Sequence, residues 1–312
     1  MIAIASLNLC NLGSDALPWR LQHFARLITD TLAAPAILAL QEIKSTGPAL
    51  ADGSVPGDAA YGALSAAIVA AGGPRYTCCE VAPIDGADGG QAGFNIRVGL
   101  LFDPQRVSLV ERAPGGPLDA TGVRRAAGSV QLTRSPGRIM PTDPAFAGCS
   151  ERHWLPSRKA LVTEFQIGGD TLFIVNCHLK SMRSPDRRAE DYAKKQRHAQ
   201  ATAIHTFCAS LLALDPQARL LIAGDMNDLC GSKTLDLLRG TQLVNLIDSL
   251  PRHERYTHRH GQRPQALDHV LVSPALQALA RVHIPHVHSN ATPPLASDHD
   301  PVLIELDLPA HG

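Results

Sequence analysis

Six short groups of polar side chains recur along the chain, and each is of a type that can bind a hard cation or move a proton. They are Asn8, Gln41-Glu42, Asn176 with His178, Asp225 with Asn227, Asp268 with His269, and the run from Ser297 to Asp300. Carboxylate and amide oxygens suit Mg²⁺, and an imidazole can exchange a proton near neutral pH. Such a set could neutralise the charge of a phosphoryl group and activate a water molecule.

Each polar group lies at one end of a predicted strand. Short aliphatic runs predict strands over 2–8, 36–40, 171–178, 220–223, 266–272 and 301–307. Taken alone, a Gly-Asp pair after a strand is usually a turn, and a lone histidine is usually a satisfied semi-buried residue. In α/β architectures, however, sites are built at strand ends. We therefore expect the six groups to converge at one edge of a sheet.

The rest of the chain alternates short strands with longer helices. Apolar residues at helical spacing predict helices over 17–32, 59–71 and 188–214, and further strands are expected over 75–82, 95–102, 106–112, 158–167 and 280–287. Residues 113–157 are rich in Pro, Gly, Ser and Arg and predict a long surface excursion. No fixed repeat and no flexible linker interrupts the pattern, so we expect a single domain over 1–312.

Composition excludes several classes of protein. The chain has 312 residues, of which 45% are hydrophobic and 19% charged, with 29 Lys and Arg against 29 Asp and Glu. This rules out a disordered or collagen-like chain, and no apolar run approaches the roughly 18 residues that span a bilayer. The seven cysteines show no zinc-ligand or redox spacing. Without a recognisable secretion signal at its start, the chain is expected to be cytoplasmic.

Taken in order, the motifs resemble those of the endonuclease/exonuclease/phosphatase superfamily, specifically its deoxyribonuclease I-like members and bacterial nucleases. The matching strings are Ser6-Leu7-Asn8, Leu40-Gln41-Glu42-Ile43, Asn176-Cys177-His178-Leu179-Lys180-Ser181, Gly224-Asp225-Met226-Asn227-Asp228, Leu267-Asp268-His269 and Ser297-Asp298-His299. The resemblance covers nearly the whole chain. It implies a four-layer α/β sandwich, in which helices flank two packed mixed β-sheets, and a metal-dependent phosphoesterase activity.

The resemblance also implies roles for these residues. Glu42, helped by Asn8 and Asp298, would hold Mg²⁺, with Mn²⁺ as a substitute. His299 would be the general base, oriented by Asp268. Asp225 and Asn227 match positions that orient the nucleophile, the phosphate or a second metal, and these alternatives stay open.

A second histidine, His178, matches the residue that assists the leaving group in deoxyribonuclease I and the neutral sphingomyelinases. By position and a short motif, Glu80 would support His178; an exposed glutamate is the less favoured alternative. Arg158 resembles a family arginine near the phosphates, and Asn176 and Lys180 are expected to contact the substrate phosphate as well.

The expected substrate is DNA or RNA, cleaved with little sequence preference. Two basic segments favour a nucleic acid: Lys180 to His198 and Ala120 to Pro141. Either segment could instead be a solvated surface, and Trp154 could stack on a base or anchor a loop. A phosphodiesterase or phosphatase acting on a phospholipid headgroup or small phosphoester is the alternative enzyme. A catalytically inactive binding module is a third alternative, and the intact set of polar groups disfavours it.

Three further observations refine this interpretation. Asp228-Leu229 and Leu267-Asp268-His269 differ from the pattern of inositol polyphosphate phosphatases, which disfavours that branch. Tyr256-Thr257 resembles a family segment that precedes the Asp268 strand. Histidines also cluster between 253 and 288, at His253, His258, His260, His283, His286 and His288, but their spacing fits no compact zinc motif, so structural or substrate-edge roles are expected.

Overall fold

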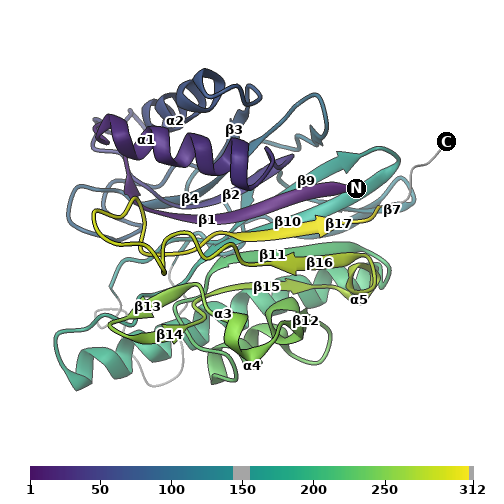
Figure 1. The fold of residues 1–312 in the computed structure, drawn as a ribbon. Helices are drawn as coiled ribbons and strands as arrows, with labels where there is room; N and C mark the ends of the chain where they lie inside the picture. Colours follow the sequence, from purple (N-terminus) through teal and green to yellow (C-terminus); the bar gives the residue numbers. More distant parts are fainter. Residues whose placement is uncertain (143–154, 309–312) are drawn as a thin grey trace.

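The computed structural model describes residues 1–142 and 155–308. Two β-sheets pack face to face, and helices cover the outer face of each (Figure 1). The expected four-layer α/β sandwich is therefore confirmed. In this part of the chain no helix is both long and apolar enough to cross a membrane.

The first sheet contains both parallel and antiparallel pairs. Its strand order is β16 (Ala280–His283), β17 (Val302–Leu306), β1 (Ile2–Leu12), β2 (Ile37–Ile43), β4 (Arg97–Phe102) and β3 (Thr77–Cys79). β1 runs parallel to β2 and antiparallel to β17. Its outer face is covered by α1 (Pro18–Arg26), which continues as a π-helical turn over Leu27–Thr31, and by α2 (Asp58–Ala70) (Figure 1).

The second sheet is also mixed. Its order is β12 (Val244–Asn245), β15 (Asp268–Val272), β11 (Arg219–Asp225), β10 (Asp170–His178), β9 (Leu161–Ile167) and β5 (Ser108–Leu109), with β8 (Gly137–Arg138) also paired to β9. The long α3 (Arg187–Leu214) and the short α4 (Lys233–Arg239) cover its outer face (Figure 1). A short α5 (Pro274–Gln277) follows β15, and 3-10 turns cover Leu246–Ser249 and Arg252–Glu254.

Two β-hairpins lie outside the sheets. β6 (Val123–Ala126) and β7 (Ser129–Leu132) pair with each other and pack beside α3. β13 (His258–His260) and β14 (Arg263–Gln265) form the second hairpin, which a bridge from His258 to His299 fastens to the segment before β17. Up to residue 142, where the described part stops, the expected excursion over 113–157 contains the strands β6, β7 and β8, and Trp154 lies outside the described residues.

Side-chain alternation along each strand decides which residues face the space between the sheets. On β10, Leu172 and Ile174 lie in the core between the sheets, whereas Phe173 and Val175 pack in the cluster that includes α3. Asn176 and His178 are an even number of residues from Ile174, so their side chains point to the same face of the sheet. The strand therefore directs both polar side chains inward, His178 at its very end.

Some predicted strands are shorter in the structure. The strand expected over 106–112 is reduced to Ser108–Leu109 because β9 offers its free edge to two partners. β5 pairs with the part of β9 near Phe165, and β8 takes the part near Leu161. β1, in contrast, is longer than predicted. It continues four residues beyond the expected end at Asn8, past a register shift between Asn8 and Leu12.

Candidate active site

Six of the predicted side chains meet at one edge of the two sheets. The Asn8 amide nitrogen donates to Glu42 Oε1 at 3.3 Å and to Asp225 Oδ2 at 3.1 Å. His178 Nε2 lies 3.4 Å from Asp225 Oδ2 and 3.8 Å from Glu42 Oε1. His299 Nε2 lies 3.9 Å from the same Asp225 oxygen, and its Nδ1 donates to Asp268 Oδ2 at 2.7 Å. Residues far apart in the sequence thus form one connected cluster.

The regular alternation of side chains along the strands places most of this cluster. Glu42 reaches it only through a local distortion of β2. Gln41 shares the inward phase of Ile37 and Ala39, so regular pleating would turn Glu42 to the helix-covered face. Instead, the register shifts between Gln41 and Ile43, and Glu42 has φ +60°. Non-glycine residues adopt this left-handed backbone rarely, and such irregularities often redirect a side chain beside a site. The shift allows Glu42 to join Asn8 and His178.

A hydrogen-bonded polar layer lies directly beneath the site and joins the two sheets. Asn176, fully buried, donates to the carbonyls of Leu40 and Gly99 at 3.0 and 2.8 Å. Its side-chain oxygen accepts from Gln41 Nε2 at 2.7 Å, and Gln41 also donates to Ser6 Oγ at 3.2 Å. The expected role of Asn176 in phosphate binding does not fit this placement, because its amide is engaged between the sheets.

His299 is held in one orientation. Asp268 accepts from its Nδ1, and Thr257 Oγ1 donates to the same Asp268 oxygen at 2.6 Å. Ser297 Oγ accepts from the His299 backbone N–H at 3.0 Å. Nε2 is therefore the ring atom left to face Asp225. Burial alone would lower the pKa of His299, but the adjoining carboxylates of Asp268 and Asp225 outweigh it and raise the pKa to about 10.

Asp225 lies at the centre of the negative charge. Burial raises the pKa of Asp225 to about 7, and the nearby Asp268 and Glu42 act in the same direction, while His299 opposes them. Only glycine fits at the position before Asp225, because the neighbouring strand lies very close. Gly224 has φ +137°, and an added Cβ would lie 2.0 Å from the carbonyl oxygen of Cys177.

This donor set suits a divalent cation. Glu42, Asp225, Asp268 and Asp298 gather at one end of the sandwich, where His178, His299 and the exposed Arg183 lie beside them. Among the described residues, three groups of side chains each offer ligand atoms within 4.8 Å of one another: Glu42 with His178 and Asp225, Asp225 with Asp268 and His299, and His258 with Asp298 and His299. Buried carboxylates need a compensating charge, and oxygen-rich sites favour hard ions such as Mg²⁺.

His178 is deeply buried, and Glu80 does not support it. Burial, together with the charges of Arg158 and His299, holds the pKa of His178 well below its usual range, so the ring is neutral. Within the described residues its Nδ1 has no hydrogen-bond partner. The Glu80 carboxylate instead accepts from the Gly57 backbone N–H at 2.7 Å and from Arg97 Nη1 at 3.4 Å. The expected His178–Glu80 pair is therefore absent from the described contacts.

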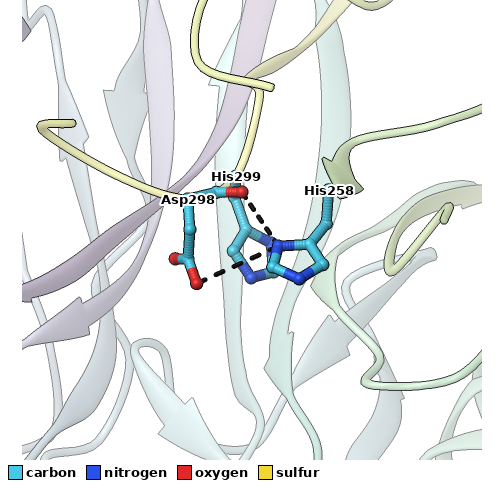
Figure 2. A group of neighbouring side chains, drawn as sticks. All are labelled: His258, Asp298 and His299. Atoms are coloured by element: carbon cyan, nitrogen blue, oxygen red, sulfur yellow. Dashed lines mark hydrogen bonds and ion pairs between the residues drawn. The ribbon is translucent and has the colours of Figure 1, made fainter. Parts of the chain in front are cut away.

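Asp298 and His258 form the outer wall of the site (Figure 2). His258 Nδ1 donates to the Asp298 carbonyl at 2.9 Å and lies 3.9 Å from Asp298 Oδ2, and its ring centroid is 5.1 Å from that of His299. Arg183 Nη2 donates to Asp298 Oδ2 at 3.2 Å. Burial alone would raise the pKa of Asp298, but His299 and His258 hold it below its usual range.

From the sequence, Thr257 had no assigned role in the site, and His258 was expected to have a structural or substrate-edge role. The signal was weak: Tyr256-Thr257 resembled a family segment, and His258 was one of a group of histidines. Only the β13–β14 hairpin and its bridge to His299 reveal their positions.

The remaining predicted residues lie around the cluster. Asn227 donates its backbone N–H to Asp225 Oδ1 at 2.8 Å and its side-chain amide to the Leu179 carbonyl at 3.2 Å. Arg158 Nη2 donates to that same carbonyl at 2.5 Å. Lys180 follows directly, and its backbone N–H donates to Gln200 Oε1 at 2.9 Å. These residues surround the ends of β10 and β11, which carry His178 and Asp225.

The two basic segments differ in what they offer a ligand. In the first segment, Arg183 is 85% exposed beside Asp298. In the second, Arg138 is buried and forms an ion pair with Asp88 at 2.8 Å, Arg134 donates to the Pro114 carbonyl at 2.8 Å, and Arg125 donates to the Leu214 carbonyl. Three of the four arginines of the second segment thus bond to the protein itself, whereas Arg124 is exposed. The segment supports nucleic acid binding less than its composition indicated.

Comparison with known proteins agrees with this geometry. The model of a family described as the endonuclease/exonuclease/phosphatase family matches residues 5–299. No curated protein sequence matches the chain significantly.

Several solved structures share the fold across nearly the whole chain. Truncated TDP2 from Caenorhabditis elegans is 15% identical with a TM-score of 0.58, covering 98% of this chain and 96% of that one. TDP2 from D. rerio, complexed with a single strand DNA product, is 15% identical with a TM-score of 0.57 and coverages of 98% and 99%. A mannosyl-6-phosphatase from Bacteroides thetaiotaomicron is 16% identical with a TM-score of 0.60 and coverages of 99% and 100%. At these identities the likeness shows a shared fold.

Proposed function

Because the chain belongs to the endonuclease/exonuclease/phosphatase family and is a metal-dependent phosphoester hydrolase, we propose that it is a nuclease that cleaves DNA or RNA with little sequence preference. One observation carries the assignment of the reaction centre: Asn8, Glu42, His178, Asp225, Asp268 and His299 meet in one connected cluster. A phosphodiester is anionic, so this cluster must attract it through a bound cation and through donor groups.

Glu42, Asn8 and Asp298 would hold the cation, with Asp225 as a further carboxylate at its edge. Mg²⁺ is the ion that fits these oxygen ligands, and Mn²⁺ would substitute for it. The ion supplies charge neutralisation at the phosphoryl oxygens.

A cation bound beside Asp225 would offset the carboxylate charge that raises the pKa of His299, and the neutral ring then accepts the proton of the attacking water at Nε2. Asp268, itself bonded by Thr257, stabilises the imidazolium that forms, because its carboxylate bonds Nδ1 at 2.7 Å. Asp225 and Asn227 orient the water or a phosphoryl oxygen. His178, at the other side of Asp225, donates a hydrogen bond from Nε2 to a phosphoryl or leaving oxygen.

The polynucleotide substrate is supported by surface charge and by a relative. Arg183 lies exposed next to Asp298, where it could contact a substrate phosphate, and the D. rerio TDP2 structure contains a single strand DNA product. The alternative is a phosphodiesterase or phosphatase acting on a phospholipid headgroup or small phosphoester. The mannosyl-6-phosphatase of the same fold favours this alternative. The contacts of Arg125, Arg134 and Arg138 favour it too, because these side chains bond to the protein itself.

A substrate panel decides between the two. Wild type and His299→Ala should be assayed with Mg²⁺ and with Mn²⁺ on plasmid DNA, single-stranded DNA, RNA, bis(p-nitrophenyl) phosphate, sugar phosphates and phospholipid vesicles. We expect wild type to cleave the polynucleotides and His299→Ala to lack this activity. Efficient hydrolysis of a sugar phosphate or phospholipid beside inert polynucleotides would overturn the nuclease assignment in favour of the alternative.

A further inference from the structure

A hollow of about 570 Å³ adjoins the outer wall of the active site. It begins at Asp298 and is lined by Arg259, Gln262, Ser289, Asn290 and Leu295, among others. The β13–β14 turn forms one side, and the loop after β16 forms the other. Small-ligand sites have volumes of roughly 300–1,000 Å³, so the hollow can accept the part of a substrate next to the reacting phosphate.

Arg259 is held rigidly in this wall. Its guanidinium lies over the Tyr256 ring, 4.8 Å from the centroid, and Tyr256 stacks in parallel on His286 at 3.8 Å. Arg259 Nη2 also donates to Asn290 Oδ1 at 3.0 Å. A planar guanidinium fixed in this way loses little further freedom when it binds an anion.

Arg259 also differs from the arginines that support the fold. Arg97, Arg112, Arg138 and Arg197 each form an ion pair with a buried carboxylate. In the described part of the chain, no carboxylate lies within ion-pair distance of Arg259. The hollow therefore combines an uncompensated guanidinium with the side-chain amide of Gln262. The Asn290 amide and the Ser289 hydroxyl line it too, but they already donate to the Tyr256 hydroxyl and to Asp300 Oδ2.

We infer that Arg259 binds the phosphate that flanks the scissile one in a polynucleotide strand. This inference rests on the proposed nuclease function and adds a subsite to it. With the scissile phosphate near Asp298 and His299, the strand continues into the hollow, and its next phosphate meets the guanidinium. A bidentate arginine–phosphate contact is among the stronger charge-assisted hydrogen-bonding arrangements. Arg259 thus favours substrates that carry more than one phosphate.

The test compares two substrates and matched variants. Arg259→Ala, Arg259→Lys and Arg263→Ala should be assayed on a single-stranded oligonucleotide and on bis(p-nitrophenyl) phosphate, which has no flanking phosphate. Arg263 is the control, because it is exposed on the opposite strand of the same hairpin and outside the residues that line the hollow.

We expect Arg259→Ala to raise KM for the oligonucleotide about tenfold, as the loss of a hydrogen bond to a charged group does, and to leave KM for the small diester unchanged, with Arg259→Lys intermediate. The slope of log KM against log salt should fall by about 0.7, the contribution of one phosphate contact to a single strand. Arg263→Ala should leave the KM of both substrates within twofold.

Two results would overturn the subsite. One is an unchanged oligonucleotide KM in Arg259→Ala. The other is an equal loss on both substrates, since this would show that Arg259 only supports the hairpin. A wild-type enzyme that hydrolyses the small diester and leaves every polynucleotide intact is a distinguishable result, because it would reject the nuclease proposal itself.

Discussion

At the scale of single residues, reactivity in this site depends on the fixed orientation of the His299 ring. Asp268, itself bonded by Thr257, keeps a proton on Nδ1 of His299, and Ser297 holds its backbone. The sequence motif identified His299 and Asp268 as partners, and the structure places them 2.7 Å apart. Thr257 completes the arrangement through a hydrogen bond that no motif spacing reveals.

The first prediction concerns His299. Replacing it by Ala should lower turnover by roughly 10² to 10⁴, the usual contribution of a positioned general base, and leave KM nearly unchanged. Steady-state kinetics on the best substrate of the panel checks this. His253→Ala is the matched control, because the His253 side chain is 81% exposed. A His299→Ala enzyme of near-normal rate would remove the base assignment.

Glu80 provides a second test at the residue scale. Its contacts are Gly57 and Arg97, so Glu80→Gln should keep the turnover of the folded enzyme within about threefold, well short of the loss expected for a member of the catalytic set. The measurement is the turnover rate per mole of folded protein, compared between Glu80→Gln and wild type. A loss of 10²-fold or more would restore the role of Glu80 as the support of His178.

The same variant should change the pH dependence of stability. Burial raises the pKa of Glu80 above its usual value, so the folded state binds a proton more readily than the unfolded state does. Wild type should therefore lose stability relative to Glu80→Gln as the pH rises from the unfolded pKa through the higher folded pKa. Urea denaturation at mildly acidic and neutral pH measures this difference, and the opposite trend would contradict the raised pKa.

At the scale of elements, the strand ends were predictable and the orientations at those ends were not. The aliphatic run Leu220 to Ala223 predicted β11, and the Gly-Asp turn predicted its polar end. The register shift that turns Glu42 inward has no such pattern. The β13–β14 hairpin is too polar to show strand alternation, and α4 is too short to show a clear helical period. These elements depend on tertiary contacts, such as the bridge between His258 and His299.

Asn176 shows the same limit. Its place near a strand end indicated phosphate binding, whereas strand phase directs it into the space between the sheets. Asn176→Ala should therefore destabilise the protein by about 2–3 kcal/mol, because Leu40 and Gly99 lose a buried hydrogen-bond donor. Urea denaturation measures the change. An Asn176→Ala protein of wild-type stability but with a raised KM would instead support the phosphate role.

At the scale of the whole molecule, each of the two sheets supplies part of the reaction centre. Asn8 and Glu42 come from the first sheet, and His178, Asp225 and Asp268 from the second, while His299 precedes β17. The overall alternation of strands and helices, and with it the four-layer fold, was predictable because the apolar periodicities are clear. The substrate was not, since the charge of a segment does not reveal whether its arginines face a ligand or the interior, as Arg138 demonstrates.

A cation that binds between the sheets should stabilise the whole fold. At ten times its Kd, Mg²⁺ would add about 1.4 kcal/mol of stability, which raises the Tm by a few degrees for a chain of this size. Thermal denaturation with Mg²⁺ and with chelator checks the shift. Hydrolysis should also disappear in excess chelator and return with added Mg²⁺, and activity that survives chelation would contradict a role for the metal.

The most direct measurement is a Mn²⁺ binding titration followed by electron paramagnetic resonance, performed on wild type, on Glu42→Gln and on Glu254→Gln as a surface control. If Glu42 and its neighbours surround a divalent cation, Glu42→Gln should weaken Mn²⁺ binding at least roughly tenfold, as the loss of a ligand or of its support does in metal sites, and Glu254→Gln should bind as wild type does. Equal Mn²⁺ affinity in all three proteins would contradict the account.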